Sequence, residues 1–267
     1  MNLLQAFFLG IIQGLTEFIP VSSTAHLLIL QQWFGLPPSD LMFAFLVIIQ
    51  LGTVLSLIVL FWNDLWAILR ATLDQRRSTP ERNLGFHIIL ATIPAALIGY
   101  LLRHAVEELF KTPMLEAAIR LFSAAILLTL AEWLGKKTRQ LEAMTWLDAL
   151  IIGFFQVIAV FPGASRSGTT ISGGMLRGLD RPSAARFAFL MSIPILLGAG
   201  GYQMLDVMNV PGLVQFLPVI AVGFVTAAVF GWFSVKWLID YLSKNSLYLF
   251  AGYCAFVGLV VLVVSMV

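Results

Sequence analysis

Long apolar stretches alternate with short polar connections along most of this 267-residue chain. Each stretch holds about 20 residues, which is the length an α-helix needs to cross the hydrocarbon core of a bilayer. The pattern therefore predicts six membrane-spanning helices. Their approximate ranges are 40–61, 86–102, 114–134, 184–204, 214–238 and 246–266.

Two further apolar stretches, near 2–35 and 147–176, are interrupted by proline and hydroxyl-bearing residues. Pro20 and Pro162 fix φ and lack an N–H, so each stretch must end one helix and begin another beyond the break. Irregular backbone at membrane depth is tolerated only where protein or a water-filled cavity surrounds it. We therefore expect two re-entrant helix pairs whose breaks line one internal cavity.

Composition narrows the class of protein. Hydrophobic residues make up 60% of the sequence, charged residues 11%, and the mean hydropathy is +0.93. These values are typical of an all-α polytopic membrane protein and exclude a water-soluble domain. The net charge of +2 does not indicate nucleic-acid binding. Cys254 is the single cysteine, so neither an internal disulfide nor a cysteine metal site is expected.

Basic residues are concentrated in alternate connections between the predicted helices. Under the positive-inside rule, these connections face the cytoplasm. The opposing connection, which contains Arg103 and Lys111, is then expected to face outward. The cytoplasmic set comprises Arg70, Arg76, Arg77, Arg82, Lys136, Lys137, Arg139, Arg177, Arg181, Arg186, Lys236 and Lys244.

The chain also contains an internal similarity: Gly10-Ile-Ile-Gln13 before the first break resembles Gly153-Phe-Phe-Gln156 before the second. Traced from the basic connections, the first broken segment enters and leaves on the outer side and the second on the cytoplasmic side. Inverted repeats of this kind place the substrate site where the broken helices meet. We predict one membrane domain over 1–267, built from halves near 1–140 and 141–267.

The first break supplies a carboxylate, hydroxyls and an imidazole within a short segment. Ser23 and His26 are three residues apart, so a helix that restarts here places them on one face, within hydrogen-bond reach. His26 is then a candidate base for Ser23. Glu17 is a candidate to orient His26, to act as the base itself or to manage the proton on the leaving phosphate. The sequence does not separate these assignments.

The second break adds Arg166, which is costly at membrane depth unless it lines a cavity and meets a substrate. Its planar guanidinium suits phosphate, as do the free N–H groups and the positive dipole end of a restarting helix. The two breaks together indicate a pyrophosphate site. Nearby polar side chains are candidates for substrate contact, although such groups commonly bond to backbone or to neighbouring helices. They are Gln13, Ser22, Thr24, Ser165, Ser167 and Thr170.

The two broken segments closely resemble the two signatures of the undecaprenyl-pyrophosphate phosphatase family, also called bacitracin-resistance proteins, and the resemblance spans the full length. Two positions differ from the commonest pattern. Gln13 stands where many members carry Glu, and Ala25 where many carry Gly. Gln13 thus removes one carboxylate and puts a metal-binding pair with Glu17 in doubt. The segments read Gln13-Gly-Leu-Thr-Glu17-Phe-Ile-Pro-Val-Ser-Ser-Thr-Ala-His26 and Pro162-Gly-Ala-Ser-Arg166-Ser-Gly-Thr-Thr170.

The resemblance implies an enzyme that removes the terminal phosphate from undecaprenyl pyrophosphate and so regenerates the lipid carrier for peptidoglycan and other cell-wall glycans. It gives catalytic roles to Glu17, Ser23, His26 and Arg166, with Ser23 as the preferred nucleophile and His26 as the competing one. It also implies Mg2+ or Ca2+ as a cofactor. The sequence itself shows no metal-ligand cluster, so the ion is expected to arrive on the substrate pyrophosphate.

Inverted repeats with broken helices also occur in secondary transporters, so a polyprenyl-phosphate transporter or flippase is the main alternative function. A dual enzyme and flippase and a noncatalytic scaffold are further alternatives. Carrying a lipid head group needs no nucleophile with an adjacent base, so the residues of the first break favour the enzyme. We expect a multi-pass protein of the bacterial plasma (inner) membrane. Its expected partners are the polyprenyl pyrophosphate lipid, the bilayer and, as a candidate, a second copy in a homodimer.

Overall fold

The computed structural model describes residues 1–74, 79–107, 113–159 and 165–265. Within these ranges the chain is helical apart from short connections and one isolated bridge between Arg139 and Leu179. This confirms the all-α prediction. The helices are α1 (Leu3–Thr16), α2 (Ser23–Trp33), α3 (Asp40–Leu60), α4 (Trp62–Leu73), α5 (Pro80–Glu107), α6 (Pro113–Leu134), the 3₁₀ turn η1 (Leu141–Ala143), α7 (Trp146–Ile158), α8 (Arg166–Leu176), α9 (Arg181–Val207), α10 (Leu213–Lys244) and α11 (Tyr248–Ser265).

The chain is a polytopic membrane protein. In the part that the structure describes, five helices are long and apolar enough to cross a membrane: α3, α5, α6, α9 and α10. The sixth expected span, α11, is apolar over Tyr248–Val264 and is shorter than these five. The apolar pattern missed α4, which follows α3 after the single residue Phe61. Asn63 and Asp64 interrupt the apolar run there, so the pattern predicts a connection for this segment.

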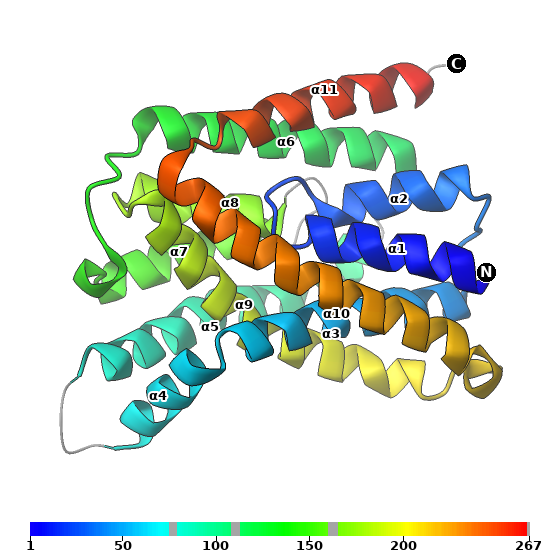
Figure 1. Ribbon diagram of the computed structural model, residues 1–267, viewed down its shortest axis with the longest axis horizontal. Helices are drawn as coiled ribbons and strands as arrows, with labels where there is room; N and C mark the ends of the chain where they lie inside the picture. The colour runs from blue at the N-terminus through cyan, green and yellow to red at the C-terminus, as the bar shows by residue number, and fades with distance from the viewer. Residues whose placement is uncertain (75–78, 108–112, 160–164, 266–267) are drawn as a thin grey trace.

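Each broken stretch forms a helix hairpin. In Figure 1 the α1–α2 hairpin opens toward the right of the view and the α7–α8 hairpin toward the left. α1 ends before Pro20 and α2 begins at Ser23, as the break predicts. α8 begins at Arg166, and Pro162 lies outside the described residues. The re-entrant placement of these hairpins in a bilayer stays a prediction.

The same kind of polar pair begins the first helix of each hairpin. Asn2 Oδ1 accepts from the Gln5 N–H and Gln5 Oε1 accepts from the Asn2 N–H, both at 2.9 Å. Thr145 and Asp148 form the equivalent pair at the start of α7. Such capping boxes satisfy N–H groups that a first helical turn leaves without partners. The two hairpins therefore begin at defined residues.

Glycines let the first helix of each hairpin approach its neighbour closely. A Cβ at Gly10 on α1 would lie 2.7 Å from the carbonyl oxygen of Gly223 on α10. A Cβ at Gly153 on α7 would lie 2.6 Å from the carbonyl oxygen of Ala91 on α5. Real side chains do not tolerate such distances, so both contacts need glycine. The two similar sequence segments thus make matching contacts, while the division of the chain near residue 140 stays a prediction.

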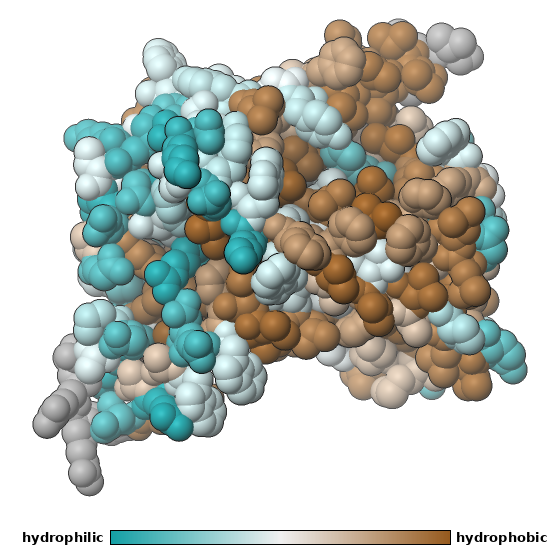
Figure 2. All heavy atoms as spheres, in the orientation of Figure 1, coloured by the Kyte–Doolittle hydropathy of each residue, from teal (hydrophilic) through white to brown (hydrophobic). Residues whose placement is uncertain are grey.

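Two basic connections meet at one end of the molecule. Asp148 is fully buried and accepts hydrogen bonds from Arg139 Nη2 and Arg177 Nε, each at 2.7 Å. Glu132 and Arg181 form a second ion pair between the same connections. These contacts place the chain after α6 beside the chain after α8, while the cytoplasmic location of both connections stays a prediction. Figure 2 shows hydrophilic residues gathered at the left end of the view. The described residues exclude Arg76, Arg77 and Lys111.

Replacing Gly10 by Ala is expected to lower the thermal midpoint of unfolding, because the new Cβ would lie 2.7 Å from a backbone oxygen of α10. Gly198→Ala on α9 is the matched control, since a Cβ built there meets no atom within 4 Å beyond its chain neighbours and the nearby backbone of its own helix. Alanine is expected to raise the stability at that position, because it favours a helix over glycine by about 1 kcal/mol. Thermal unfolding of both variants in one detergent measures the difference. Equal midpoints would contradict the close approach of α1 and α10.

Candidate functional site

The two breaks are joined by side chains that lie 149 residues apart in the sequence. Arg166 Nη2, in the first turn of α8, forms an ion pair with Glu17 Oε1 in the first break. Beside it, Ser167 Oγ donates to the carbonyl oxygen of Ile19 at 3.3 Å. The Arg166 side chain is 18% exposed and the Glu17 side chain 7%. The structure therefore brings the two sequence motifs into one largely buried cluster.

Glu17 lies at the centre of this cluster. Its Oε2 accepts hydrogen bonds from Ser23 Oγ at 2.6 Å and from Gln13 Nε2 at 3.0 Å. With Arg166 on Oε1, both carboxylate oxygens have partners. Hydrogen bonds to a carboxylate from a hydroxyl are short and strong when the carboxylate is ionised. The Ser23 hydroxyl proton is thus directed at Glu17.

Ser22 turns the chain sharply into α2. Its backbone has φ 67° and ψ 90°, a conformation that costs a residue other than glycine on the order of 1–3 kcal/mol. This turn directs the Ser22 carbonyl oxygen at His26, where it meets the backbone N–H at 3.3 Å and Nδ1 at 2.9 Å. The Ser22 side chain does not cap α2. The first-turn N–H groups therefore donate no hydrogen bond to that hydroxyl.

His26 does not face Ser23, and this corrects the pairing that the three-residue spacing predicts. Its Nδ1 lies against the Ser22 carbonyl, and its Nε2 lies 2.8 Å from the Tyr253 hydroxyl on α11. Among the described residues, Ser23 donates to Glu17 instead, and Glu17 has no hydrogen bond to the imidazole. Sequence reasoning missed Tyr253. It lies 227 residues from His26, and no local spacing links the two.

Most of the other hydroxyls of the second break form hydrogen bonds within α8. Ser165 Oγ caps α8 by accepting a backbone N–H at 3.2 Å, and Thr170 Oγ1 donates to the Arg166 carbonyl oxygen at 2.8 Å. Ser167 reaches across to the first break, as described above. Thr24 is exposed at the start of α2. The contact of these side chains with a substrate stays a prediction.

The side chains around Glu17 do not fit a divalent cation held by the protein alone. Within the described ranges, no three His, Cys, Asp or Glu side chains lie together so as to hold a metal ion. Gln13 presents its amide N–H to Glu17 where a second carboxylate would be needed. Mg2+ and Ca2+ take most of their ligands from carboxylate, carbonyl and water oxygens. A single carboxylate whose oxygens already have partners supplies too few.

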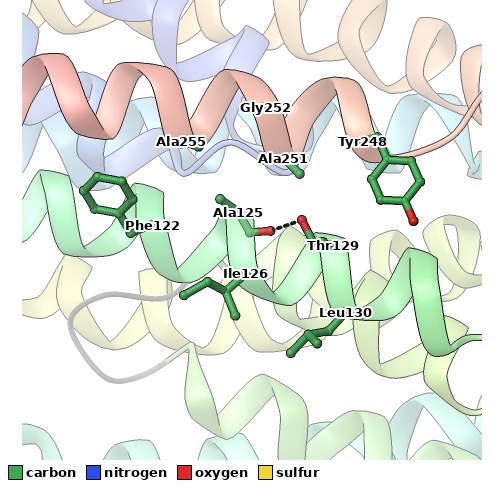
Figure 3. A pocket seen from close by; sticks show the side chains of 9 residues that line it. All are labelled: Phe122, Ala125, Ile126, Thr129, Leu130, Tyr248, Ala251, Gly252 and Ala255. Carbon is green, nitrogen blue, oxygen red and sulfur yellow. Dashed lines mark hydrogen bonds between the residues drawn. The ribbon is translucent and has the colours of Figure 1, made fainter.

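Two cavities of the described structure lie away from the breaks. One, of about 520 Å³, lies between α6 and α11; Figure 3 shows its mostly apolar lining, in which Thr129 Oγ1 donates to the Ala125 carbonyl at 2.7 Å. The other, of about 170 Å³, is lined by His87 and Glu142 among others. Neither contains a residue of the two motifs. Among the described residues the breaks meet in a direct ion pair, and an internal cavity between them stays a prediction.

Comparison with known proteins gives consistent matches over nearly the whole chain. The family profile described as bacitracin resistance protein BacA matches residues 6–260. A protein from Moorella thermoacetica named undecaprenyl-diphosphatase is 40% identical over 95% of this chain and 94% of its own length. A protein of the same name from Pelobacter propionicus is 41% identical over 97% and 95%. Another, from Anaeromyxobacter dehalogenans, is 42% identical over 94% and 87%.

Proposed function

The chain belongs to the bacitracin resistance protein BacA family, and from this we propose that it hydrolyses undecaprenyl pyrophosphate to undecaprenyl phosphate and inorganic phosphate. The observation that carries the proposal is the cluster in which Glu17 contacts both Ser23 and Arg166. It combines a nucleophile, a proton acceptor and fixed positive charge, which phosphoryl transfer requires. The reaction regenerates the lipid carrier for peptidoglycan and other cell-wall glycans.

Arg166 is the main binding group for the pyrophosphate. Its guanidinium pairs with Glu17 in the structure. Phosphate oxygens carry more negative charge than one carboxylate and match the guanidinium fork, so the substrate competes with Glu17 for Arg166. The N-termini of α2 and α8 begin at Ser23 and Arg166 and favour an anion at the same place. Substrate binding therefore moves Arg166 from Glu17 to the phosphates. Glu17 is then available to accept the proton of Ser23.

In the first step, Ser23 Oγ attacks the terminal phosphorus of the pyrophosphate. A bond forms from Oγ to that phosphorus, and the bond from the phosphorus to the bridging oxygen breaks, with its electron pair leaving on undecaprenyl phosphate. The Ser23 proton passes to Glu17, whose Oε2 lies 2.6 Å away, and from there to the departing phosphate. The enzyme is left with a phosphoserine.

In the second step, water attacks the phosphoserine. A bond forms from the water oxygen to phosphorus, and the Ser23 oxygen–phosphorus bond breaks. Glu17 takes a proton from the water and returns it to Ser23 Oγ, so inorganic phosphate leaves and the free enzyme is restored. One carboxylate thus acts as base and acid in both steps, which its position against the hydroxyl supports.

Ser23 is preferred to His26 as the nucleophile. Both ring nitrogens of His26 have partners, the Ser22 carbonyl on one side and the Tyr253 hydroxyl on the other. Ser23 instead lies at the N-terminus of a helix, where a phosphate binds favourably. No observation favours the alternative of a polyprenyl-phosphate transporter or flippase, because carrying a head group does not need a serine held against a carboxylate.

Three further expectations accompany the phosphatase. A divalent cation, Mg2+ or Ca2+, enters bound to the substrate pyrophosphate, since the side chains around Glu17 supply too few ligands to hold it alone. The protein lies in the bacterial plasma (inner) membrane, in keeping with its spanning helices and its family. Assembly as a homodimer is the third expectation, and native mass spectrometry in detergent tests it.

Release of phosphate from undecaprenyl pyrophosphate by the purified protein tests the proposed function. Arg166→Ala is expected to lose at least about 100-fold in kcat/KM while the protein stays folded, because loss of one preorganised donor costs that much. Ser23→Ala is expected to lose far more activity than its neighbour Ser22→Ala, since only Ser23 supplies the nucleophile. EDTA-treated samples measure the dependence on a divalent cation.

These assays have clear opposing outcomes. Near-normal activity of Arg166→Ala would contradict the assignment of the site. Equal losses of activity in the two serine variants would favour His26 as the nucleophile. So would the absence of phosphoserine, measured by mass spectrometry, in quenched single turnovers. Absence of phosphate release from well-folded wild-type protein would favour transport.

Glu17→Gln is expected to bind inorganic pyrophosphate about tenfold more tightly than the wild type, while its turnover is lost. The variant removes the negative charge that competes for Arg166, and a tenfold change corresponds to roughly 1.4 kcal/mol. Isothermal titration in detergent measures the affinity, with Arg166→Ala as the control that is expected to weaken it. Weaker binding by Glu17→Gln would show that the carboxylate helps to hold the anion and would contradict competition for Arg166.

A further inference from the structure

The imidazole of His26 is held on both edges, and only one of its two partners belongs to the first break. Nδ1 lies 2.9 Å from the Ser22 carbonyl oxygen, within the same segment. Nε2 lies 2.8 Å from the hydroxyl of Tyr253, which comes from α11 near the other end of the chain. The two rings lie nearly parallel, 7° apart, with centroids separated by 5.7 Å. No motif that defines the site includes Tyr253.

These contacts fix the position of the ring proton. A carbonyl oxygen can only accept, so Nδ1 of His26 must carry the hydrogen that it gives to Ser22. In the neutral ring, Nε2 then has a free lone pair and accepts from the Tyr253 hydroxyl. The hydrogen bond at one ring nitrogen determines which nitrogen is protonated. The Ser22 carbonyl thus selects the Nδ1-protonated tautomer, and the Tyr253 hydroxyl, which can donate or accept, donates to Nε2 and holds the ring in place.

α11 is well placed to hold this contact. Cys254, the next residue, is buried, and its thiol lies 3.8 Å from the carbonyl oxygen of Pro20, so α11 meets the first break at two consecutive residues. The start of α11 is tied to α6 because the Leu247 N–H donates to Glu132 Oε2 at 3.0 Å. Figure 1 shows α11 lying along α6. The Tyr253 hydroxyl is therefore presented by a packed helix and not by a loop.

The selected tautomer supports the strained turn at Ser22. That residue has φ 67° and ψ 90°, and a strained conformation persists only where its surroundings hold it. The Nδ1–H of His26 supplies one such hold on the Ser22 carbonyl. With the other tautomer, a lone pair would face that oxygen and repel it. Ser23, the proposed nucleophile, follows directly and donates to Glu17.

We propose that Tyr253 is a positioning residue of the phosphatase: its hydroxyl donates to Nε2 of His26 and holds the imidazole where Nδ1–H binds the Ser22 carbonyl. This contact holds the Ser22 turn that presents Ser23 to Glu17. The role in turnover rests on the proposed function, whereas the tautomer does not. Tyr253 acts through His26 and needs no contact with the reacting phosphorus.

Nitrogen NMR of protein labelled with ¹⁵N-histidine tests the tautomer directly. The chain has three histidines, so a His26→Gln variant assigns the His26 signals by their loss. At a pH where the ring is neutral, the wild type is expected to show a protonated Nδ1 and an unprotonated, hydrogen-bonded Nε2. Tyr253→Phe keeps the ring and removes the hydroxyl, so the Nε2 resonance is expected to move downfield. A protonated Nε2 in the wild type, or an unchanged resonance in Tyr253→Phe, would overturn the proposal.

Steady-state kinetics tests the consequence for turnover. Tyr253→Phe is expected to lower kcat about tenfold with KM within about twofold of the wild type, because the nucleophile is misplaced while Arg166 still binds the phosphates. Tyr202→Phe, at an exposed tyrosine on α9, is the matched control and is expected to leave both constants unchanged. The thermal midpoints of the two variants are expected to agree, which separates positioning from a general loss of stability.

The outcomes distinguish this proposal from the proposed function. Full activity in Tyr253→Phe alongside inactive Arg166→Ala would overturn the role of Tyr253 and leave the phosphatase in place. A lower kcat in Tyr253→Phe that is accompanied by a lower thermal midpoint than that of Tyr202→Phe would also overturn it. If Arg166→Ala stays active, the proposed site fails, and the NMR result still decides the tautomer on its own.

Discussion

The buried ion pair between Glu17 and Arg166 is the interaction on which the site depends. Each residue stands at the tip of a different helix hairpin, so neither hairpin holds a complete site. Taking two charges out of water costs several kcal/mol per ion, and the pair is stable only if further hydrogen bonds complete it. Ser23 and Gln13 supply such bonds to the same carboxylate. The groups that complete the ion pair are thus the groups that we assign to the reaction.

The surrounding helices hold the two tips in register. α1 and α7 approach α10 and α5 so closely that only Gly10 and Gly153 fit at the contacts. At the far end, the fully buried Asp148 joins Arg139 to Arg177 and so fixes the ends of the α7–α8 hairpin. Such a frame allows the strained backbone at the start of α2 to persist where phosphate is expected to bind. Close helix contacts and buried ion pairs thus lie away from the breaks, where the groups that we assign to the reaction meet.

Much of this arrangement could be predicted from the sequence because it rests on local patterns. The apolar runs located the long helices, and Pro20 with its following serines located the first break. α4 was missed because polar residues interrupt its apolar pattern directly after α3. Helical spacing favoured His26 as the partner of Ser23, whereas the structure places Ser23 against Glu17, the alternative base that the sequence left open. The turn at Ser22 and the hydroxyl of Tyr253 engage the imidazole instead, and both depend on backbone conformation and on contacts distant in sequence.

A double-mutant cycle on Glu17 and Arg166 tests the central claim most directly. Glu17→Gln, Arg166→Gln and the double variant would be compared with the wild type by reversible unfolding in one detergent. Each single change leaves one buried charge without its partner, so the double variant is expected to lose less than the sum of the two single losses, by at least about 1 kcal/mol. Strictly additive losses would contradict the account, because they would mean that the two hairpin tips are not coupled through this pair.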